Sequence, residues 1–158
     1  MNFIPKDKKF PKIFKFRLKK EKAVEHRTIS LIYGNYGLKA MSTGILTVKH
    51  FEILRLCIRR GLKKRGKFWF RTFPYTFLTK KPLEVRMGKG KGGHYKWICP
   101  IKIGQILVEF RLRRRNYLEI LLLLRKCKKR LPLKCQIISR SKKLLKNNLE
   151  KNFKKIMN

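Results

Sequence analysis

Acidic residues are scarce in this sequence. Asp and Glu together number 8 against 44 Lys and Arg, so the formal net charge is +36. A surplus of that size destabilises a compact free chain by self-repulsion unless a polyanion neutralises it. The eight acids are also scattered, so they form no evident acid–base pair for catalysis. The composition therefore argues against an enzyme and predicts a polyanionic partner.

Long apolar runs are absent as well. The strongest candidate, residues 120–124, is only five residues long and has arginines on both sides, whereas a membrane-spanning helix needs about 20 residues. The first twenty residues lack the apolar core of a secretory signal, and they contain Asp7 and few arginines, which fits a mitochondrial presequence poorly. Basic and apolar residues do not segregate into one long amphipathic helix, which disfavours a membrane surface as partner. Nucleic acid is the expected polyanion.

Clustered metal ligands are missing too. The four cysteines, Cys57, Cys99, Cys127 and Cys135, include no CxxC pair, and the three histidines are far apart in the sequence. Zinc sites and redox motifs require close spacing. We therefore expect no metal, no cofactor and four reduced thiols.

Apolar and aromatic residues, by contrast, are plentiful. Hydrophobic residues make up 43% of the chain, including eleven Phe, five Tyr and two Trp, which is too many for a disordered basic tail. Residues 1–27 alternate basic residues with Phe and Ile around two prolines, which favours a basic arm that orders on RNA. Residues 28–139 have the length and pattern of one folded domain, and residues 140–158 form a second basic extension, either a helix or an arm.

Periodicity predicts the elements of the first half of that domain. Residues 29–33 have the pattern of a short strand, followed by a Gly34–Asn35 turn and a second extended segment at 36–40. A helix is then predicted between Thr47 as N-cap and Gly66 as stop, because apolar residues recur there at three- and four-residue spacing.

The second half has mostly strand character. Strands are predicted at 67–73 and 77–83, and residues 95–101 and 105–110 are expected to pair as a hairpin around Pro100 and Gly104. A second helix is predicted at 113–130, ended by Pro132, and a last strand at 134–139.

A glycine- and lysine-rich segment lies between two of these strands. Gly88, Gly90 and Gly93 formally satisfy the GxGxxG pattern of dinucleotide enzymes, but a strand follows them where that motif requires a helix. The glycines instead suit an extended loop whose backbone passes close to RNA, with Arg86, Lys89 and Lys91 facing phosphates. An ordinary solvent-exposed hairpin loop is the alternative.

The run from Lys67 to Phe110, KFWFRTFPYTFLTKKPLEVRMGKGKGGHYKWICPIKIGQILVEF, resembles the L-sixteen family of bacterial and organellar large-subunit ribosomal proteins. The segments at 33–40 (YGNYGLKA), 44–47 and 131–134 are similar to family motifs, and so is the basic start at 5–15. The chain departs from the family at residues 75–77, at Lys96 and at the basic entry to the second helix, and residues 140–158 are an added tail.

This resemblance implies an α+β fold: an antiparallel β-sheet with two packed helices, a Gly/Lys-rich hairpin loop, and basic N- and C-terminal extensions. It also implies a structural constituent of the large ribosomal subunit that binds rRNA near the peptidyl-transferase centre and supports tRNA placement in translation. The implied partners are rRNA, tRNA and neighbouring ribosomal proteins, without homo-oligomers. Carried over by position, the tRNA- and rRNA-binding loop is Arg86, Met87, Gly88, Lys89, Gly90, Lys91 and Gly92.

Further rRNA contacts are expected from cations outside this loop. They belong to the N-terminal arm, the first helix and the strands before the loop: Lys6, Lys8, Lys9, Lys12, Lys15, Arg17, Lys49, Arg60, Lys64, Arg71, Lys80 and Lys81.

The start of the chain and its composition indicate a compartment. The family-like start lies within five residues of Met1, so we expect no cleavable import sequence. The chain is also rich in Lys, Ile, Leu, Phe and Asn, as in A+T-rich coding sequences. We expect a mitochondrion-encoded protein of the mitochondrial ribosome, with a plastid or a bacterial cytoplasm as the alternative. A free-standing RNA chaperone or ribosome assembly factor is the alternative function.

Overall fold

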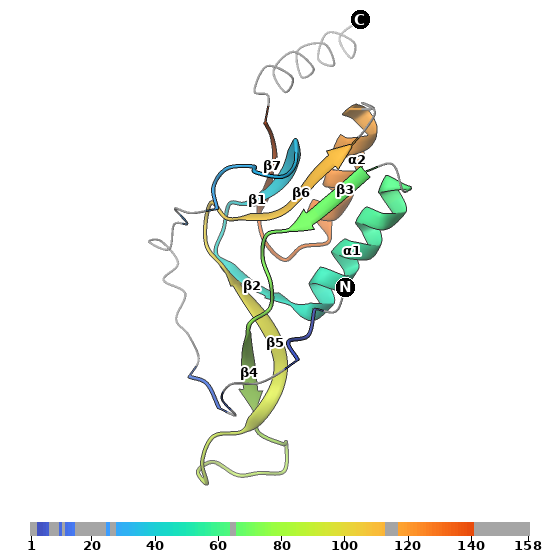
Figure 1. Cartoon of the computed structure of the whole chain (residues 1–158). Helices are drawn as coiled ribbons and strands as arrows, with labels where there is room; N and C mark the ends of the chain where they lie inside the picture. The colour runs from blue at the N-terminus through green and yellow to red at the C-terminus, as the bar shows by residue number, and fades with distance from the viewer. Residues whose placement is uncertain are drawn as a thin grey trace, which may run out of the picture.

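The computed structural model describes residues 3–6, 10, 12–14, 25, 28–63, 66–112 and 117–140 (Figure 1). Two helices and seven strands follow one another in this part of the chain. They are β1 (Tyr36–Ala40), β2 (Gly44–Thr47), α1 (Val48–Leu62), β3 (Gly66–Phe70), β4 (Thr76–Lys80), β5 (Gly93–Ile101), β6 (Ile106–Leu112), α2 (Tyr117–Lys129) and β7 (Cys135–Ser139). The expected α+β fold with two helices and antiparallel strands is confirmed. The predicted C-terminal extension, apart from Arg140, and much of the N-terminal arm lie outside the described residues.

The strands divide between two antiparallel sheets. One sheet has the order β3-β6-β1-β7, and the other has the order β2-β5-β4. The predicted hairpin of residues 95–101 with 105–110 is therefore wrong, because β5 and β6 belong to different sheets. Between the two strands, Gly104 adopts φ 89° and donates its N–H to the carbonyl of Ala40, which precedes β2. The chain then enters β6, which lies between β1 and β3.

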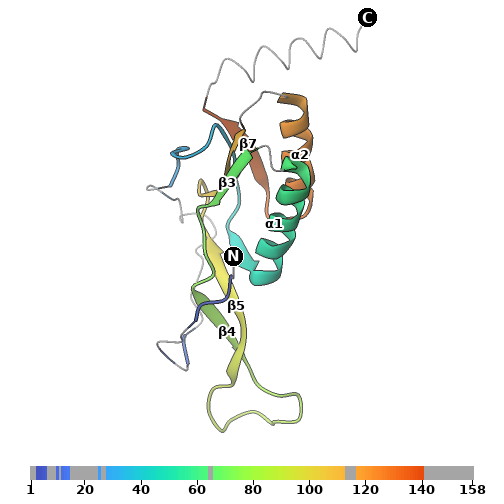
Figure 2. The same ribbon diagram turned by 45° about the vertical axis from the view of Figure 1, so that its right-hand side comes forward.

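Both helices pack on one face of the four-stranded sheet (Figure 2). Each helix buries a stripe at helical spacing, as expected for α1 from the sequence. The stripes are Phe51, Leu54, Ile58 and Leu62 in α1, and Ile120, Leu123, Leu124 and Cys127 in α2. The helices approach closely at Gly61, where a Cβ atom would lie 2.4 Å from Cδ1 of Leu123. Only glycine allows this contact without a shift of the neighbouring side chain.

The ends of α1 differ partly from expectation. Thr47 is the N-cap, as predicted, and its backbone N–H donates to Nδ1 of His50 at 3.1 Å. The helix does not continue to Gly66. It stops at Lys63, which has left-handed φ and ψ of 43° and 44° and donates its N–H to the carbonyl of Arg59. Gly66 instead begins β3.

The segment before β1 corrects another expectation. A strand was predicted at residues 29–33, but this segment lies outside both sheets and has bends at Ser30, Ile32 and Tyr33. Their polar backbone groups face a buried carboxylate, because the N–H groups of Ile32, Tyr33 and Gly34 all donate to Oε2 of Glu109. A backbone whose donors converge on one side chain cannot present them to a neighbouring strand.

The N-terminal segment contacts the core at one described residue. Phe3 is 3% exposed, and its ring centroid lies 5.5 Å from that of Phe51 and 5.0 Å from that of Phe70. Burial of one aromatic ring therefore holds the start of the predicted arm against α1 and β3.

Candidate RNA-binding surface

The Gly/Lys-rich segment is the tip of the β4–β5 hairpin. Strands β4 and β5 pair antiparallel from Thr76–Ile98 to Lys80–Gly93, and residues 81–92 connect them. The hairpin extends away from the helices and the four-stranded sheet (Figures 1 and 2). Every residue from 82 to 90 is exposed, and Met87 retains 99% of its accessible surface. The predicted hairpin loop is thus present and is offered to solvent along its whole tip.

The backbone of the tip has left-handed conformation at three consecutive residues. Gly88, Lys89 and Gly90 have φ angles of 90°, 50° and 83°. A Cβ atom added at Gly88 or Gly90 would have nothing within 4 Å, so conformation and not crowding requires glycine there. Gly92 is different, because its Cβ would lie 2.5 Å from the backbone carbon of Lys80. The tip is open while the base of the loop is tightly packed.

The cations of the loop divide into two groups. Arg86 and Lys89 are exposed at the tip. Lys81 donates from Nζ to the carbonyl of Gly88, across the loop. Lys91 is half-buried, donates from Nζ to the carbonyl of Ile13, and lies 4.5 Å from the ring centroid of Phe14. Lys81 and Lys91 therefore hold the loop and the N-terminal segment in place, while Arg86 and Lys89 present charge outward.

The outer face of α1 carries two of the predicted rRNA-binding cations. Lys49 and Arg60 are exposed, and helical spacing aligns them with the exposed Ile53 and Leu56 on the side away from the core. The corresponding face of α2 carries Leu118, Leu122, Arg125 and Lys129, all exposed. Each helix thus buries one stripe and presents a second stripe that mixes aliphatic and cationic side chains.

The remaining predicted cations are only partly described. Lys6, Lys12 and Lys80 are exposed, and Nζ of Lys80 lies 5.3 Å from the ring centroid of Tyr95. Lys8, Lys9, Lys15, Arg17 and Lys64 lie outside the described residues.

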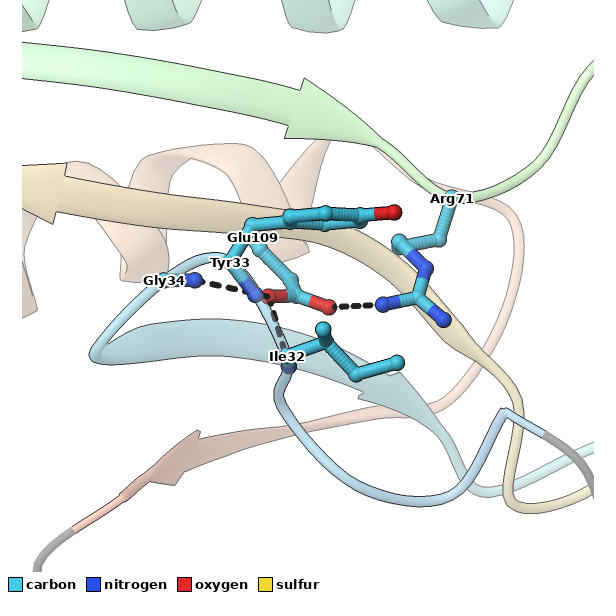
Figure 3. Close-up of polar contacts among 5 residues, drawn as sticks. All are labelled: Ile32, Tyr33, Gly34, Arg71 and Glu109. Atoms are coloured by element: carbon cyan, nitrogen blue, oxygen red, sulfur yellow. Dashed lines mark hydrogen bonds and ion pairs between the residues drawn. The ribbon is translucent and has the colours of Figure 1, made fainter.

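Arg71 occupies a different environment from the other predicted cations (Figure 3). Its Nη1 lies 2.7 Å from Oε1 of Glu109, and the two side chains are 12% and 0% exposed. The guanidinium also lies 5.2 Å from the ring centroid of Tyr33, which in turn packs against Trp69 with centroids 5.9 Å apart. Arg71 therefore has a structural role in addition to the RNA contact predicted for it, which stays a prediction.

Glu109 is the residue that the sequence reading missed. Its Oε2 accepts hydrogen bonds from three consecutive backbone N–H groups, at 3.1, 2.7 and 2.8 Å, while Oε1 binds Arg71. The carboxylate thus joins the segment before β1 to β6 and to the residue after β3. One signal in the sequence could have revealed it: a single acid within the apolar run ILVEF requires a buried partner in a chain with so few acids.

Metal-binding clusters and membrane-spanning helices are both absent from the described residues. This part of the chain holds no group of three or more His, Cys, Asp or Glu side chains that could bind a metal ion. None of the helices in the described ranges is long and apolar enough to cross a membrane. All four cysteines are buried free thiols, and burial raises the pKa of Cys99 to about 12 and that of Cys135 to about 11.

Comparisons with known proteins bear on the assignment. The family model described as "Ribosomal protein L16p/L10e" matches residues 5–138. The large ribosomal subunit protein uL16 of Aeromonas hydrophila is 44% identical over 105 residues, which cover 66% of this chain and 74% of that protein. The protein of the same description from Aeromonas salmonicida matches with the same identity and coverage. The chain thus belongs to the ribosomal protein L16p/L10e family and is a structural component of the ribosome, not an enzyme.

Proposed function

We propose that this structural constituent of the large ribosomal subunit binds its rRNA near the peptidyl-transferase centre and supports tRNA placement with the tip of the 81–92 loop. The observation that carries the proposal is the β4–β5 hairpin, which holds an exposed basic loop away from the folded body. A protein that only coated rRNA would not need a long projection with its own internal supports.

The body has the features of an rRNA-binding surface. The chain has a net charge of +36, and exposed Lys and Arg occur on α1, α2 and the strands. Lysine and arginine bind phosphate oxygens and release the counterions condensed on the nucleic acid. Contacts of this kind position a protein on RNA without reading its sequence. Large-subunit rRNA and neighbouring ribosomal proteins are the partners of the body, which binds as a single copy.

The tip of the loop suits a second polyanion. Arg86 and Lys89 supply two exposed charges, and Gly88 and Gly90 leave open space beside the backbone. A phosphate backbone can approach such a chain more closely than one that carries side chains. We assign the tip to tRNA because the internal contacts of Lys81 and Lys91 keep it in a defined shape outside the body.

The ribosome in question is bacterial or organellar. We propose the mitochondrial ribosome, since the chain is rich in Lys, Ile, Leu, Phe and Asn. Mass spectrometry of ribosomes purified from isolated mitochondria, plastids and cytosol tests this, and recovery of the chain only outside mitochondria would overturn it.

The loop is tested with ribosomes that carry the double variant Arg86→Ala/Lys89→Ala. Both side chains are exposed, so the fold and subunit assembly are expected to survive, whereas tRNA binding is expected to fall about tenfold, because two phosphate contacts are lost. The matched control is Lys67→Ala/Arg111→Ala, which removes two exposed cations that face each other on β3 and β6. Filter binding of labelled tRNA and the rate of peptide synthesis are measured for both.

Two outcomes would count against the proposal. Unchanged tRNA binding in the loop variant would remove the tRNA assignment, and failure of that variant to assemble would make the loop an rRNA anchor. The structural role has its own test, a high-salt wash of purified large subunits. The protein is expected to remain bound, whereas its complete loss would favour the RNA chaperone or assembly factor.

A further inference from the structure

Two cysteine side chains meet at the interface between the helices. Sγ of Cys57 in α1 lies 3.7 Å from Sγ of Cys127 in α2, and the two residues are 70 positions apart in the sequence. Both thiols are free, with 8% and 0% exposure. The other cysteines are placed differently, since Cys99 lies in β5 and Cys135 in β7, and Sγ of Cys99 contacts the carbonyl of Pro100.

The two sulfur atoms are in van der Waals contact. A disulfide has an S–S distance of about 2.05 Å, so the two sulfur atoms must approach by about 1.7 Å. Rotation of the two side chains and a small helix shift can supply a movement of this size. Close packing of Gly61 against Leu123, one turn away on both helices, keeps α1 and α2 side by side.

A small reagent can reach one of the two thiols. Cys57 lines a hollow of about 460 Å³ between α1 and α2, together with Gly61 and Leu123. One water molecule occupies about 30 Å³ in the liquid, so the hollow admits molecules of comparable size. Cys127 is fully buried and does not line this hollow, so a reagent in the hollow meets Cys57 first.

We propose that Cys57 and Cys127 form an oxidative modification site, at which hydrogen peroxide links α1 to α2 by a disulfide. The Cys57 sulfur attacks the peroxide, the O–O bond breaks, and Cys57 becomes a sulfenic acid as one water leaves. Sγ of Cys127 then attacks the sulfenic sulfur, and the hydroxyl leaves as a second water. Two thiols are oxidised by two electrons and one peroxide is reduced to two waters.

The environment of Cys127 sets the pace of the second step. Burial, followed by the neighbouring Cys57, raises the pKa of the Cys127 thiol above its usual range. Because the thiolate is the attacking form, disulfide formation is slow at neutral pH and accelerates as the pH rises.

The link would lock the two helices together. It closes a loop of about 70 residues, and cross-links of that span restrict the unfolded chain strongly. The melting temperature of the oxidised protein is expected to rise by about 5–10 °C. A helix shift of less than about 1.7 Å leaves the outer stripes of α1 and α2 exposed, so RNA binding by the oxidised protein is expected to be nearly unchanged.

The test uses the purified full-length chain, treated with hydrogen peroxide and then with an alkylating reagent that blocks remaining thiols. Peptide mapping without reductant is expected to show Cys57 joined to Cys127, with a mass two hydrogens below the sum of the peptides. Reduction with dithiothreitol should separate them and reverse the rise in melting temperature. Cys57→Ser and Cys127→Ser should each abolish the link, whereas Cys99→Ser, at an equally buried thiol, should leave it intact.

The double variant Cys99→Ser/Cys135→Ser keeps only the proposed pair, so the result does not depend on whether the Cys57 and Cys127 variants fold. The link must still form in that variant. Recovery of Cys57 as a sulfinic acid with Cys127 still alkylatable would overturn the proposal. So would a disulfide in the wild-type chain that joins Cys99 or Cys135, or one that joins two copies of the chain.

Discussion

Arg71 and Arg86 are fifteen residues apart in a strongly basic chain, yet the fold gives them opposite surroundings. The Arg71 side chain is 12% exposed and forms an ion pair with Glu109, while Arg86 is exposed at the tip of the hairpin. In the body of the molecule, which has a hydrophobic core, the buried charge of Glu109 is paired with Arg71. The loop has exposed charges and no hydrophobic core. A net charge of +36 therefore conceals two kinds of cation, those that support the fold and those that face outward. Variants that affect one region and spare the other test this distinction.

The largest effect is expected in the body, at Glu109. The substitution Glu109→Gln removes the buried negative charge, leaves Arg71 without its partner, and turns an amide toward three backbone donors. Loss of one member of a buried ion pair costs about 3–5 kcal/mol, and we expect the unfolding free energy to fall by about that amount. Urea denaturation followed by circular dichroism measures it. The control is Glu84→Gln in the exposed loop, and equal effects of the two variants would remove the distinction between the regions.

The next largest effect is expected at the base of the loop, where alanine substitutions at the adjacent Gly92 and Gly93 are compared. Gly92→Ala places a Cβ 2.5 Å from the backbone of Lys80, whereas a Cβ at Gly93 meets nothing within 4 Å. We expect Gly92→Ala to destabilise the hairpin by about 1–3 kcal/mol, because backbone atoms must move, and Gly93→Ala to be nearly neutral. Hydrogen exchange of the β4–β5 amides measures both. Similar protection in the two variants would contradict the close packing at Gly92.

A smaller effect distinguishes outward from internal lysines within the loop. The logarithm of the affinity for RNA should fall linearly with the logarithm of the salt concentration. Lys89→Ala should reduce the magnitude of this slope by about 0.7–0.9, because one phosphate contact is lost. Lys91→Ala should leave the slope unchanged and loosen the segment at Ile13 and Phe14, because Lys91 binds that segment. Fluorescence anisotropy with a labelled tRNA, the polyanion assigned to the tip, gives both slopes. An equal loss of slope in the two variants would mean that Lys91 also binds phosphate.

The smallest effect is expected in the pH dependence of stability, through His50 at the start of α1. Burial, followed by the charge of Lys96, lowers the pKa of His50 below its usual value, and Nδ1 of the neutral ring accepts the N–H of Thr47. The unfolded chain then binds a proton at His50 more readily than the folded chain does. The stability that neutral His50 contributes is therefore fully present above the unfolded-state pKa of about 6.5, and it is lost as the pH falls through the lower pKa of the folded state. His50→Gln keeps an acceptor without titrating.

Thermal melts between pH 7.5 and 5 check this expectation. The wild-type melting temperature should fall by about 1–2 °C more than that of the His50→Gln variant, since only one partly exposed cap is involved. Parallel pH profiles of the two proteins would show that the cap does not titrate in this range.

Local patterns predicted much of the fold. The stripe of α1 and the cap at Thr47 depend on residues within one or two turns of each other, and both are confirmed. The hairpin loop was also predictable, because glycines and lysines interrupt two strand-forming runs. The strand predicted at 29–33 and the pairing of residues 95–101 with 105–110 were wrong for one reason. Both depend on partners that local periodicity does not identify.

The sequence by itself determined the class of partner, the family and the order of most elements, because charge and side-chain periodicity are properties of the chain in any conformation. Only the tertiary structure decided which lysines and arginines are internal, since that depends on groups distant in the sequence. Glu109 binds backbone donors 75 to 77 residues away, and Lys91 binds a carbonyl 78 residues away. These contacts form only when the sheets bring the segments together, and Cys57 meets Cys127 across 70 residues for the same reason.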